Sequence, residues 1–332
     1  MAKPVSVERV VAAPDKYKGT ATASEVAGAI AAAIETAGGH CVQVPLADGG
    51  DGTLDALGGA NRHSEVTGPL GEQVNAPWRL DNGVAVIEMA HASGLVLAGG
   101  KQGNDPLQAT TTGVGELIAE AIDAGATKII VGVGGSATTD GGLGAIEAIG
   151  SPARLAGVDL VVACDVRTRF VDAAAVFAPQ KGASDAQVTM LGRRLTALAD
   201  RYQAEHGIDV TQLERGGAAG GLAGGLAAFG ASLVDGFDVV SEHVGLEDAI
   251  EHATLIVTGE GFLDEESFDG KVVGGVAQLA ASNDVPVLAI AGQVFDDAGV
   301  RIDAISLADE FGLERAMEHP LLCITEAVAN WL

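Results

Sequence analysis

Basic residues are scarce in this chain. Its 332 residues include 19 Lys and Arg against 45 Asp and Glu, a formal net charge of −26. Nucleic acids and anionic membranes are bound through basic surfaces, so the composition excludes both as partners. No apolar run reaches the roughly 20 residues that span a bilayer, and the first residues lack the pattern of a secretion signal. We therefore expect a cytoplasmic protein.

Cysteines and aromatic residues are also few. The three cysteines, Cys41, Cys164 and Cys323, have no CxxC spacing, so neither a zinc site nor a disulfide framework is expected. Hydrophobic residues make up 48% of the chain and aromatic residues 4%. The apolar residues are mostly aliphatic and come in short runs separated by glycine, which predicts an α/β fold with a substantial core.

Two nucleotide-binding signatures are missing as well. There is no GxxxxGK[ST] loop, so a P-loop NTPase is not expected. No GxGxxG follows the first predicted strand, which argues against a dinucleotide-dependent oxidoreductase. Apolar periodicity predicts strands at 7–13, 41–45, 129–133, 160–163, 255–258, 285–291 and 304–307, and helices at 24–37, 116–124, 185–205 and 324–331.

The segment from residue 62 to residue 90 differs from the rest. Three short strand-like runs are separated by Gly-Pro and Asp-Asn-Gly turns, a pattern typical of an antiparallel meander. Such a meander does not belong in a doubly wound parallel sheet. We predict a discontinuous, parallel, Rossmann- or flavodoxin-like domain at 1–60 and 246–332, and an inserted mixed-sheet α/β domain at 61–245.

The sequence KIIVGVGGSATTDGGLG, residues 128–144, carries a candidate phosphate site. A buried strand runs into glycines and hydroxyls, and a helix is predicted to begin near Gly142, so backbone amides there could bind an anion. The alternative is a tight turn in which Ser136 or Asp140 only caps the helix. The candidate nucleotide-binding residues here are Gly134, Gly135, Ser136, Thr138 and Asp140.

The few lysines are concentrated in motifs rich in glycine or proline. Lys16, Lys18, Lys181 and Lys271 all lie in such motifs, and an acidic protein that binds an anion needs a local cationic pocket. The alternative is that each is an exposed loop lysine. Arg167 and Gln180 lie close in sequence to Lys181 and extend this set of candidates.

Acidic residues follow several predicted strands. Asp48 and Asp51 lie between glycines, Asp165 follows an apolar run, and Glu260 follows the strand at 255–258. Carboxylates in such places suit a magnesium ion or substrate hydroxyls, although aspartate beside glycine is also common in plain turns. His91 is expected to be a packed or hydrogen-bonded residue rather than a catalyst.

Taken together, these motifs resemble the type I glycerate kinase family. The resemblance covers nearly the whole chain, in family order: APDKYKGTATASEV, PLADGGDGT, IEMAHASGL, NDPLQATTTGVGELI, GVGGSATTDGG, VACDV, FAPQKGA, GGAAGGL and TGEGFLD with GK. It implies a two-domain kinase that uses ATP and Mg²⁺ to phosphorylate D-glycerate to 2-phosphoglycerate, with its active site in the interdomain cleft.

Phosphoryl transfer requires positioning and charge neutralisation. We expect Lys18 and Lys181 to neutralise the glycerate carboxylate and the transferring phosphoryl group. Asp48 and Asp165 are expected to bind Mg²⁺ or orient the hydroxyl, and Glu260 is a further candidate on the nucleotide side. The remaining candidates for substrate binding are Lys16, Asp51, Arg167, Gln180 and Lys271.

One departure from the family pattern bears on the substrate. The family usually has a basic residue after GEG, whereas this chain has Phe262, and the following run is Asp-Glu-Glu-Ser instead of an amide-bearing one. Two alternatives therefore stand beside glycerate phosphorylation: a kinase for another small hydroxy acid, and a non-catalytic sensor of nucleotide or hydroxy acid. The sequence is compatible with a monomer or a homodimer.

Overall fold

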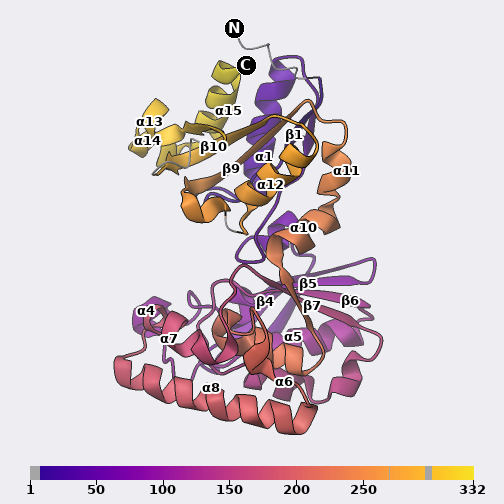
Figure 1. The fold of residues 1–332 in the computed structure, drawn as a ribbon, viewed down its shortest axis with the longest axis vertical. Helices are drawn as coiled ribbons and strands as arrows, with labels where there is room; N and C mark the ends of the chain where they lie inside the picture. Colours follow the sequence, from indigo (N-terminus) through magenta and orange to yellow (C-terminus); the bar gives the residue numbers. More distant parts are fainter. Residues whose placement is uncertain (1–7, 269, 296–300) are drawn as a thin grey trace. The chain divides into compact units, whose positions relative to one another are not determined.

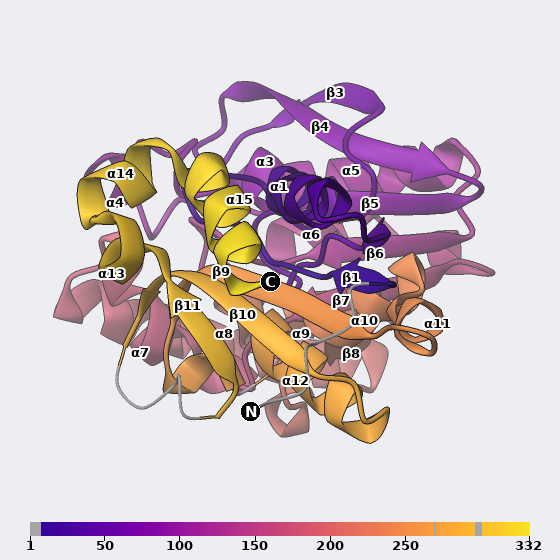
Figure 2. The ribbon, with the colours of Figure 1, turned by 90° about the horizontal axis from the view of Figure 1, so that it is seen from above.

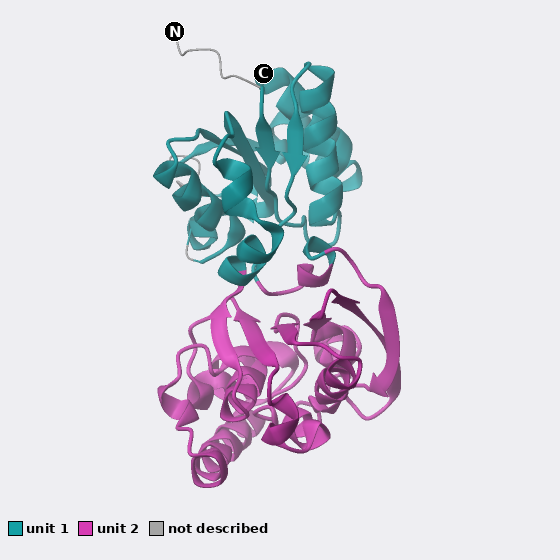
Figure 3. Ribbon diagram, turned by 90° about the vertical axis from the view of Figure 1, so that its right-hand side faces the viewer, with its two compact units in different colours: residues 1–48, 55–57, 237–332 teal, residues 49–54, 58–236 magenta. Residues whose placement is uncertain are grey.

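The computed structural model describes residues 8–268, 270–295 and 301–332. The chain forms two compact units: unit 1 comprises residues 1–48, 55–57 and 237–332, and unit 2 comprises residues 49–54 and 58–236 (Figure 3). Each unit is built on one sheet, the first parallel and the second mixed. The predicted α/β fold with one parallel and one mixed sheet is confirmed.

Unit 1 contains a five-stranded sheet in the order β11-β10-β9-β1-β2, with every pairing parallel. Its strands are β1 (Val10–Ala12), β2 (Cys41–Gln43), β9 (Leu255–Leu263), β10 (Val287–Val294) and β11 (Asp303–Ser306). Its helices are α1 (Ala23–Thr36), α11 (Leu246–Ile250), α12 (Val272–Ser282), α13 (Leu307–Phe311), α14 (Leu313–Glu318) and α15 (Pro320–Trp331), while α2 (Thr53–Ala56) and α10 (Gly236–Val244) each contain residues of both units.

Helices cover both faces of this sheet. Helix α1 begins with a capping box, in which Thr22 and Glu25 satisfy each other's backbone N–H groups. Its buried Ile30 and Ile34 join α15 in one core, and α12 covers the opposite face through Val273 (Figures 1 and 2). Alternate residues of β10 enter the two cores, as a strand buried on both faces requires.

Unit 2 contains a six-stranded sheet in the order β3-β4-β5-β6-β7-β8. Its first two pairings are antiparallel and the other three are parallel. The strands are β3 (Arg62–Thr67), β4 (Gln73–Asp81), β5 (Val84–Glu88), β6 (Lys128–Gly132), β7 (Asp159–Cys164) and β8 (Ser232–Asp235). The helices are α3 (Ala90–Ser93), α4 (Gly100–Gly103), α5 (Thr112–Asp123), α6 (Leu143–Ile149), α7 (Ala173–Phe177), α8 (Asp185–His206) and α9 (Leu222–Ala228).

The main core of unit 2 lies between one face of its sheet and helices α5, α6, α8 and α9. Ile87, Val131 and Val162 enter this core from adjacent strands. Gly115 of α5 lies so close to the backbone of Ala145 in α6 that a side chain there would collide with the Ala145 carbonyl. The two helices therefore pack closely because one of them carries glycine at the contact.

The predicted strands and long helices are confirmed, with shifted ends. Residue 7, the first of the predicted strand 7–13, lies outside the described residues. Helix α5 begins four residues before the predicted start, because Gly113 and Gly115 hide its periodicity in the sequence. Strand β9 continues past the predicted end at 258 through Leu263, since residues 259–263 pair with β10.

The compact units divide the chain differently from the predicted boundaries at 60/61 and 245/246. Residues 49–54 group with unit 2 because Gly49 accepts a hydrogen bond from Val133 N and the Glu88 carboxylate accepts one from Leu54 N. Residues 237–245 group with unit 1, where the Phe237 ring packs against Gly275 of α12. These three contacts join residues far apart in sequence, which is why composition alone does not reveal them.

Candidate active site

Strand β1 is the switch point of the unit 1 sheet. The chain continues from β1 to β2 on one side, and on its other side β1 pairs with β9. In open parallel sheets, ligands bind outside the carboxyl ends of the strands at such a point. The loop at residues 13–20, the end of the 44–48 segment and the carboxyl half of β9 all lie at this edge.

The loop after β1 is held rigidly. The Asp15 N–H donates to Gly259 O at 2.8 Å, and the Tyr17 hydroxyl donates to Ile290 O at 2.7 Å. Burial raises the pKa of Tyr17 well above its usual range, so its hydroxyl stays protonated and remains a donor. The position of Lys18 is thereby fixed by its two neighbours in the loop.

Carboxylates gather at this edge in an environment that disfavours their charge. Burial, with a smaller contribution from Asp48, raises the pKa of Asp15 to about 6, although Lys16 opposes the shift. Burial also raises the pKa of Glu260 to about 7, with Asp15 adding to it and Lys271 opposing it. One Glu260 oxygen, Oε1, is buried without a hydrogen-bond partner among the described residues. Such an oxygen is ready to accept a donor or a cation.

The two other predicted site lysines of unit 1, Lys18 and Lys271, differ in their partners. The Lys18 side chain is exposed and makes no hydrogen bond or ion pair within the described ranges. Lys271 lies at the start of α12, 3.8 Å from a Glu266 carboxylate oxygen. Of the predicted cationic site residues in this unit, Lys18 is therefore the one whose charge is available to an incoming anion.

In unit 2 the loop at residues 133–142 follows β6 and leads into α6. The Asp140 carboxylate anchors it by accepting four hydrogen bonds: from the N–H and hydroxyl of Thr111 at 2.9 and 2.8 Å, from Gly142 N at 3.1 Å and from Gly144 N at 3.3 Å. These hydrogen bonds hold the loop and cap the start of α6. Helix capping is the alternative role for Asp140 that the sequence left open.

Lys181 lies on the short 3₁₀ turn Pro179–Lys181 and is 2% exposed. Its ammonium donates to Thr138 O at 2.6 Å. Burial lowers the pKa of Lys181 to about 7, and Asp140 partly opposes this. Its backbone carbonyl accepts a hydrogen bond from Asn104 at 2.9 Å. Lys181 therefore supports the loop through its hydrogen bond to the Thr138 carbonyl. Its amino group is close to half-protonated at neutral pH.

The backbone of neighbouring segments packs closely against the same loop. A Cβ at Gly134 would lie 2.6 Å from the Gly50 Cα, and one at Gly220 would collide with the Thr138 carbonyl. Gly220 also has φ of +68°, next to Ala219 with φ of +53°. Only glycine fits such close approaches, so the loop and the Gly-rich tract at 216–222 are complementary in shape.

The polar residues next to this loop are partly unpaired. Glu88 is buried, accepts from Leu54 N at 2.6 Å and lies 3.3 Å from His91 Nε2, so the expectation of a hydrogen-bonded His91 is confirmed. This hydrogen bond raises the pKa of His91. The Ser93 hydroxyl and the Asn104 Oδ1 are buried without a hydrogen-bond partner in the described part of the chain.

The other predicted site residues of unit 2 are exposed. Asp51, Asp165, Arg167 and Gln180 lie at the surface of loops that follow strands or short helices. Ser136 is half-buried in an isolated bridge to Gly94. In unit 2 the structure brings Lys181 into a hydrogen bond with Thr138 and within electrostatic reach of Asp140. In unit 1 it brings Lys16, Asp48 and Glu260 within electrostatic reach of Asp15.

The sequence of this chain is similar to those of known proteins. The model of the Glycerate kinase family matches residues 10–154 and 151–330. The chain is 42% identical to the glycerate 2-kinase of Escherichia coli (strain K12), over 88% of this chain and 87% of the relative. It is 39% identical to the glycerate kinase of Bacillus subtilis (strain 168), over 94% and 93%.

A solved structure agrees in fold. A crystal structure provisionally named glycerate kinase 2 from Salmonella typhimurium LT2 has a TM-score of 0.83 and 36% sequence identity, over 98% of both chains. The chain belongs to the glycerate kinase family. A kinase family implies use of a nucleoside triphosphate.

For a glycerate kinase, the described residues also limit how metal is held. They contain no group of three or more His, Cys, Asp or Glu side chains that could bind a metal ion by themselves. Mg²⁺ in kinases is usually held by one or two carboxylates together with substrate phosphates, which does not require such a group. A search of the same residues finds no helix long and apolar enough to cross a membrane.

Sequence reasoning missed Asp15 and Thr111. Asp15 lies three residues after the end of β1, whereas Asp165 follows β7 directly, so the signal of a carboxylate at a strand end is weaker for Asp15. Thr111 lies in a run of three threonines, and only its hydrogen bonds to Asp140 separate it from the other two. No sequence signal marks that partnership, because the two positions are 29 residues apart in the chain.

Proposed function

We propose that this protein is an ATP-dependent, Mg²⁺-assisted glycerate 2-kinase that converts D-glycerate to 2-phosphoglycerate and ADP. The observation that carries the proposal is the 42% identity, over most of both chains, to a protein named glycerate 2-kinase. The site chemistry supports it, since an available lysine and several carboxylates suit an anionic acceptor and a metal-bound phosphate chain.

In this proposal Lys18 neutralises negative charge on the transferring phosphoryl group or on the glycerate carboxylate. It has no competing partner among the described residues. Lys16 and Lys271 are nearby candidates for substrate binding. Asp48 and Asp165 are proposed to bind Mg²⁺ or to orient the attacking hydroxyl, and Glu260, with its raised pKa, can accept a proton near neutral pH.

When bound, Mg²⁺ would neutralise phosphate charge and hold the phosphate oxygens in line for transfer. Asp48 of unit 1 is a suitable ligand for Mg²⁺. The negative charge of Asp48 already disfavours ionisation of Asp15, and a cation between the two carboxylates would offset their repulsion. The protein's own contribution is to hold these carboxylates on rigid strand ends.

The loop around Gly134, Gly135, Ser136 and Thr138 is proposed to hold nucleotide phosphates through its backbone N–H groups. Lys181 supports this loop through Thr138. Gly135 has φ of +68° and is exposed. We expect Gly135→Val to abolish ATP binding measured by calorimetry. Gly59→Val is the matched control, since Gly59 has φ of +74° and open space around it. Unchanged affinity in Gly135→Val removes the loop from the site.

A coupled ADP-release assay with D-glycerate tests the function itself. Enolase acts on 2-phosphoglycerate directly, whereas 3-phosphoglycerate needs a mutase first, so phosphoenolpyruvate formation with enolase alone identifies the 2-phosphate product. A requirement for added mutase would instead assign 3-phosphoglycerate. L-glycerate is the control for the acceptor's configuration.

The same assay separates the alternatives. Phe262 is 51% exposed at the carboxyl half of β9, where the family usually has a basic residue. If another small hydroxy acid, such as a four-carbon aldonate, gives a higher kcat/KM than D-glycerate in a substrate panel, the acceptor is that acid. Retained ATP binding with no turnover of any acid identifies a non-catalytic sensor.

A further inference from the structure

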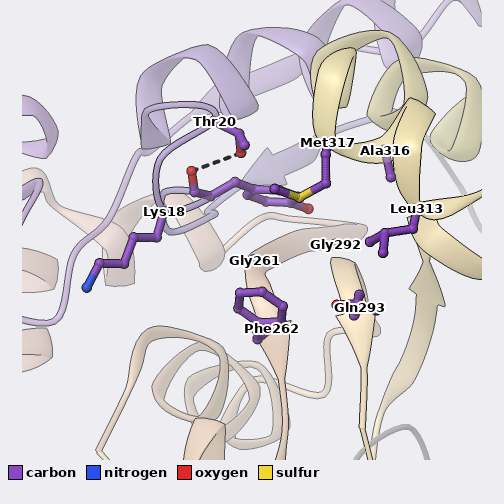
Figure 4. Close-up of a pocket in the computed structure, with 10 residues that line it drawn as sticks. Lys18, Thr20, Gly261, Phe262, Gly292, Gln293, Leu313, Ala316 and Met317 are labelled. Carbon is purple, nitrogen blue, oxygen red and sulfur yellow. Dashed lines mark hydrogen bonds between the residues drawn. The ribbon is translucent and has the colours of Figure 1, made fainter.

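A pocket in unit 1 has walls that the catalytic proposal does not use. Residues from the loop after β1, from β9 and β10 and from α14 surround it (Figure 4). The lining residues are Tyr17, Lys18, Thr20, Gly261, Phe262, Gly292, Gln293, Leu313, Ala316 and Met317. The pocket lies at the carboxyl edge of the parallel sheet, beside the switch point at β1.

The strands at its floor carry glycine. Gly261 of β9 and Gly292 of β10 run so close together that a Cβ at Gly292 would lie 2.5 Å from Gly261 O. Any side chain at Gly261 would point toward the backbone of Lys18, 3.6 Å away. The absence of two side chains leaves a flat strip of backbone beside which a flat group can lie.

The walls are apolar but include one amide. Phe262 and Gln293 are register partners in a parallel pair, so their side chains lie side by side on one face of the sheet, as Figure 4 shows. Leu313 and Met317 reach in from α14 on the other side, and each is 52% exposed. An aromatic face, a thioether and an amide together suit a planar heteroaromatic ring.

The charge of the pocket is separated from its apolar part. In Figure 4 the Lys18 side chain runs away from Phe262 and from the α14 residues, so its ammonium lies at the margin. A small hydroxy acid such as glycerate has its carboxylate only a few bonds from its hydroxyl groups and has no separate apolar part, so it cannot occupy the apolar walls while it places an anion at the margin. A nucleotide has this shape, with a flat base at one end and phosphates at the other.

We propose that this pocket binds the adenine ring of the nucleotide, with Phe262 stacking on the ring and the Gln293 amide hydrogen-bonding its edge. The inference rests on the proposed kinase function and deepens it by naming the site of the base. It also accounts for an aromatic side chain that is half exposed at the carboxyl edge of the sheet, beside Phe295 at a ring-centroid distance of 5.9 Å.

Two variants of the full chain test it by calorimetry with ADP and by steady-state kinetics. Base–aromatic stacking contributes about 1–3 kcal/mol per base, so Phe262→Ala is expected to raise the Kd for ADP and the KM for ATP by about tenfold. Phe262→Trp should keep both within about threefold of wild type. Gln293→Leu should reduce the preference for ATP over CTP. The KM for glycerate should stay unchanged in all three.

Leu322→Ala is the matched control, because Leu322 is an exposed apolar residue of the same unit, 60% exposed, outside the pocket. Wild-type ADP affinity in both Phe262→Ala and Gln293→Leu overturns the inference. So does a raised KM for glycerate with an unchanged KM for ATP, which would place the acceptor in the pocket. If wild type binds ADP in a Phe262-dependent manner but phosphorylates no acid, the kinase proposal fails and the base pocket stands.

Discussion

The charged groups of the two units differ in how far their hydrogen bonds are satisfied within the protein. In unit 1, Glu260 is buried with an unpaired oxygen and a pKa raised to about 7, and Lys18 has no partner among the described residues. In unit 2, Asp140 accepts four hydrogen bonds and Lys181 donates to the Thr138 carbonyl. A buried charged group without hydrogen-bond partners is a candidate for ligand binding, whereas a charged group whose hydrogen bonds are satisfied within the protein holds the backbone in place.

This difference between the units predicts whether a substitution lowers stability or activity. In unit 2 the polar side chains shape a loop whose backbone is presented to a ligand, so their loss should appear first as lost stability. In unit 1 we propose that the side chains themselves contact the ligand. Their loss should appear as lost activity at unchanged or even increased stability.

The largest effect is expected from Asp140→Ala. Removing a buried carboxylate leaves four donors without their acceptor, and we expect the free energy of unfolding to fall by about 4 kcal/mol. Urea denaturation measures this. The exposed Asp172 supplies the control, since Asp172→Ala should change stability by less than about 0.5 kcal/mol. An Asp140→Ala variant that keeps wild-type stability but loses nucleotide affinity would contradict this expectation and would assign Asp140 to nucleotide binding.

Lys18→Ala should leave the fold intact and lower kcat/KM by at least about a hundredfold, because it removes a cation that neutralises charge in the transition state. The ADP-release assay measures it, and thermal unfolding checks the fold. Lys101→Ala, which removes an exposed lysine of unit 2, is the control. Wild-type kinetics in Lys18→Ala would exclude the proposed role.

Glu260→Gln tests whether buried charge is costly at the unit 1 edge. The folded pKa of about 7 lies above the unfolded value of 4.5, so the contribution of Glu260 to stability is complete below pH 4.5 and is lost as pH rises through 7. Wild type should match Glu260→Gln at pH 5 and be less stable by about 2 kcal/mol at pH 8. Exposed Glu265 gives the control, Glu265→Gln. A difference that does not vary with pH would contradict the shift.

The smallest effect compares two buried tyrosines, one in each unit. The Tyr17 hydroxyl donates to Ile290 O, and the Tyr202 hydroxyl donates to Gly141 O at 3.0 Å. Tyr17→Phe and Tyr202→Phe should each lower the free energy of unfolding by about 1 kcal/mol. Equal losses with a larger fall in kcat/KM for Tyr17→Phe would sharpen the comparison, since Tyr17 adjoins Lys18. No loss of stability in either would contradict the role of these hydroxyls.

The sequence predicted the fold well where the signal was local. Runs such as Ile129–Val131 are short, β-branched and bounded by glycine, so the strand is evident without its neighbours. The meander at 62–90 was equally clear from its turn residues. The extension of β9 to Leu263 was not, because residues 259–263 are strand only through their pairing with β10.

The candidate site was predictable in part for the same reason. The positions of Lys18 and Asp48 at strand ends follow from local pattern, and their roles remain predictions. The alternatives for Asp140 could not be separated in the sequence, because its partner Thr111 is distant in the chain. The pocket around Phe262 was equally invisible, since α14 lies about 50 residues after β9.

By itself the sequence determined the class of fold, the order of the elements and the motifs of the glycerate kinase family. Each of these depends on composition or on neighbours within a few residues. The tertiary structure decided which charges are buried, paired or available, because burial and pairing are set by residues from different elements. Only that distribution separates Asp140, whose carboxylate accepts four hydrogen bonds, from Glu260, which has a buried oxygen without a partner, and from Lys18, which has no partner among the described residues.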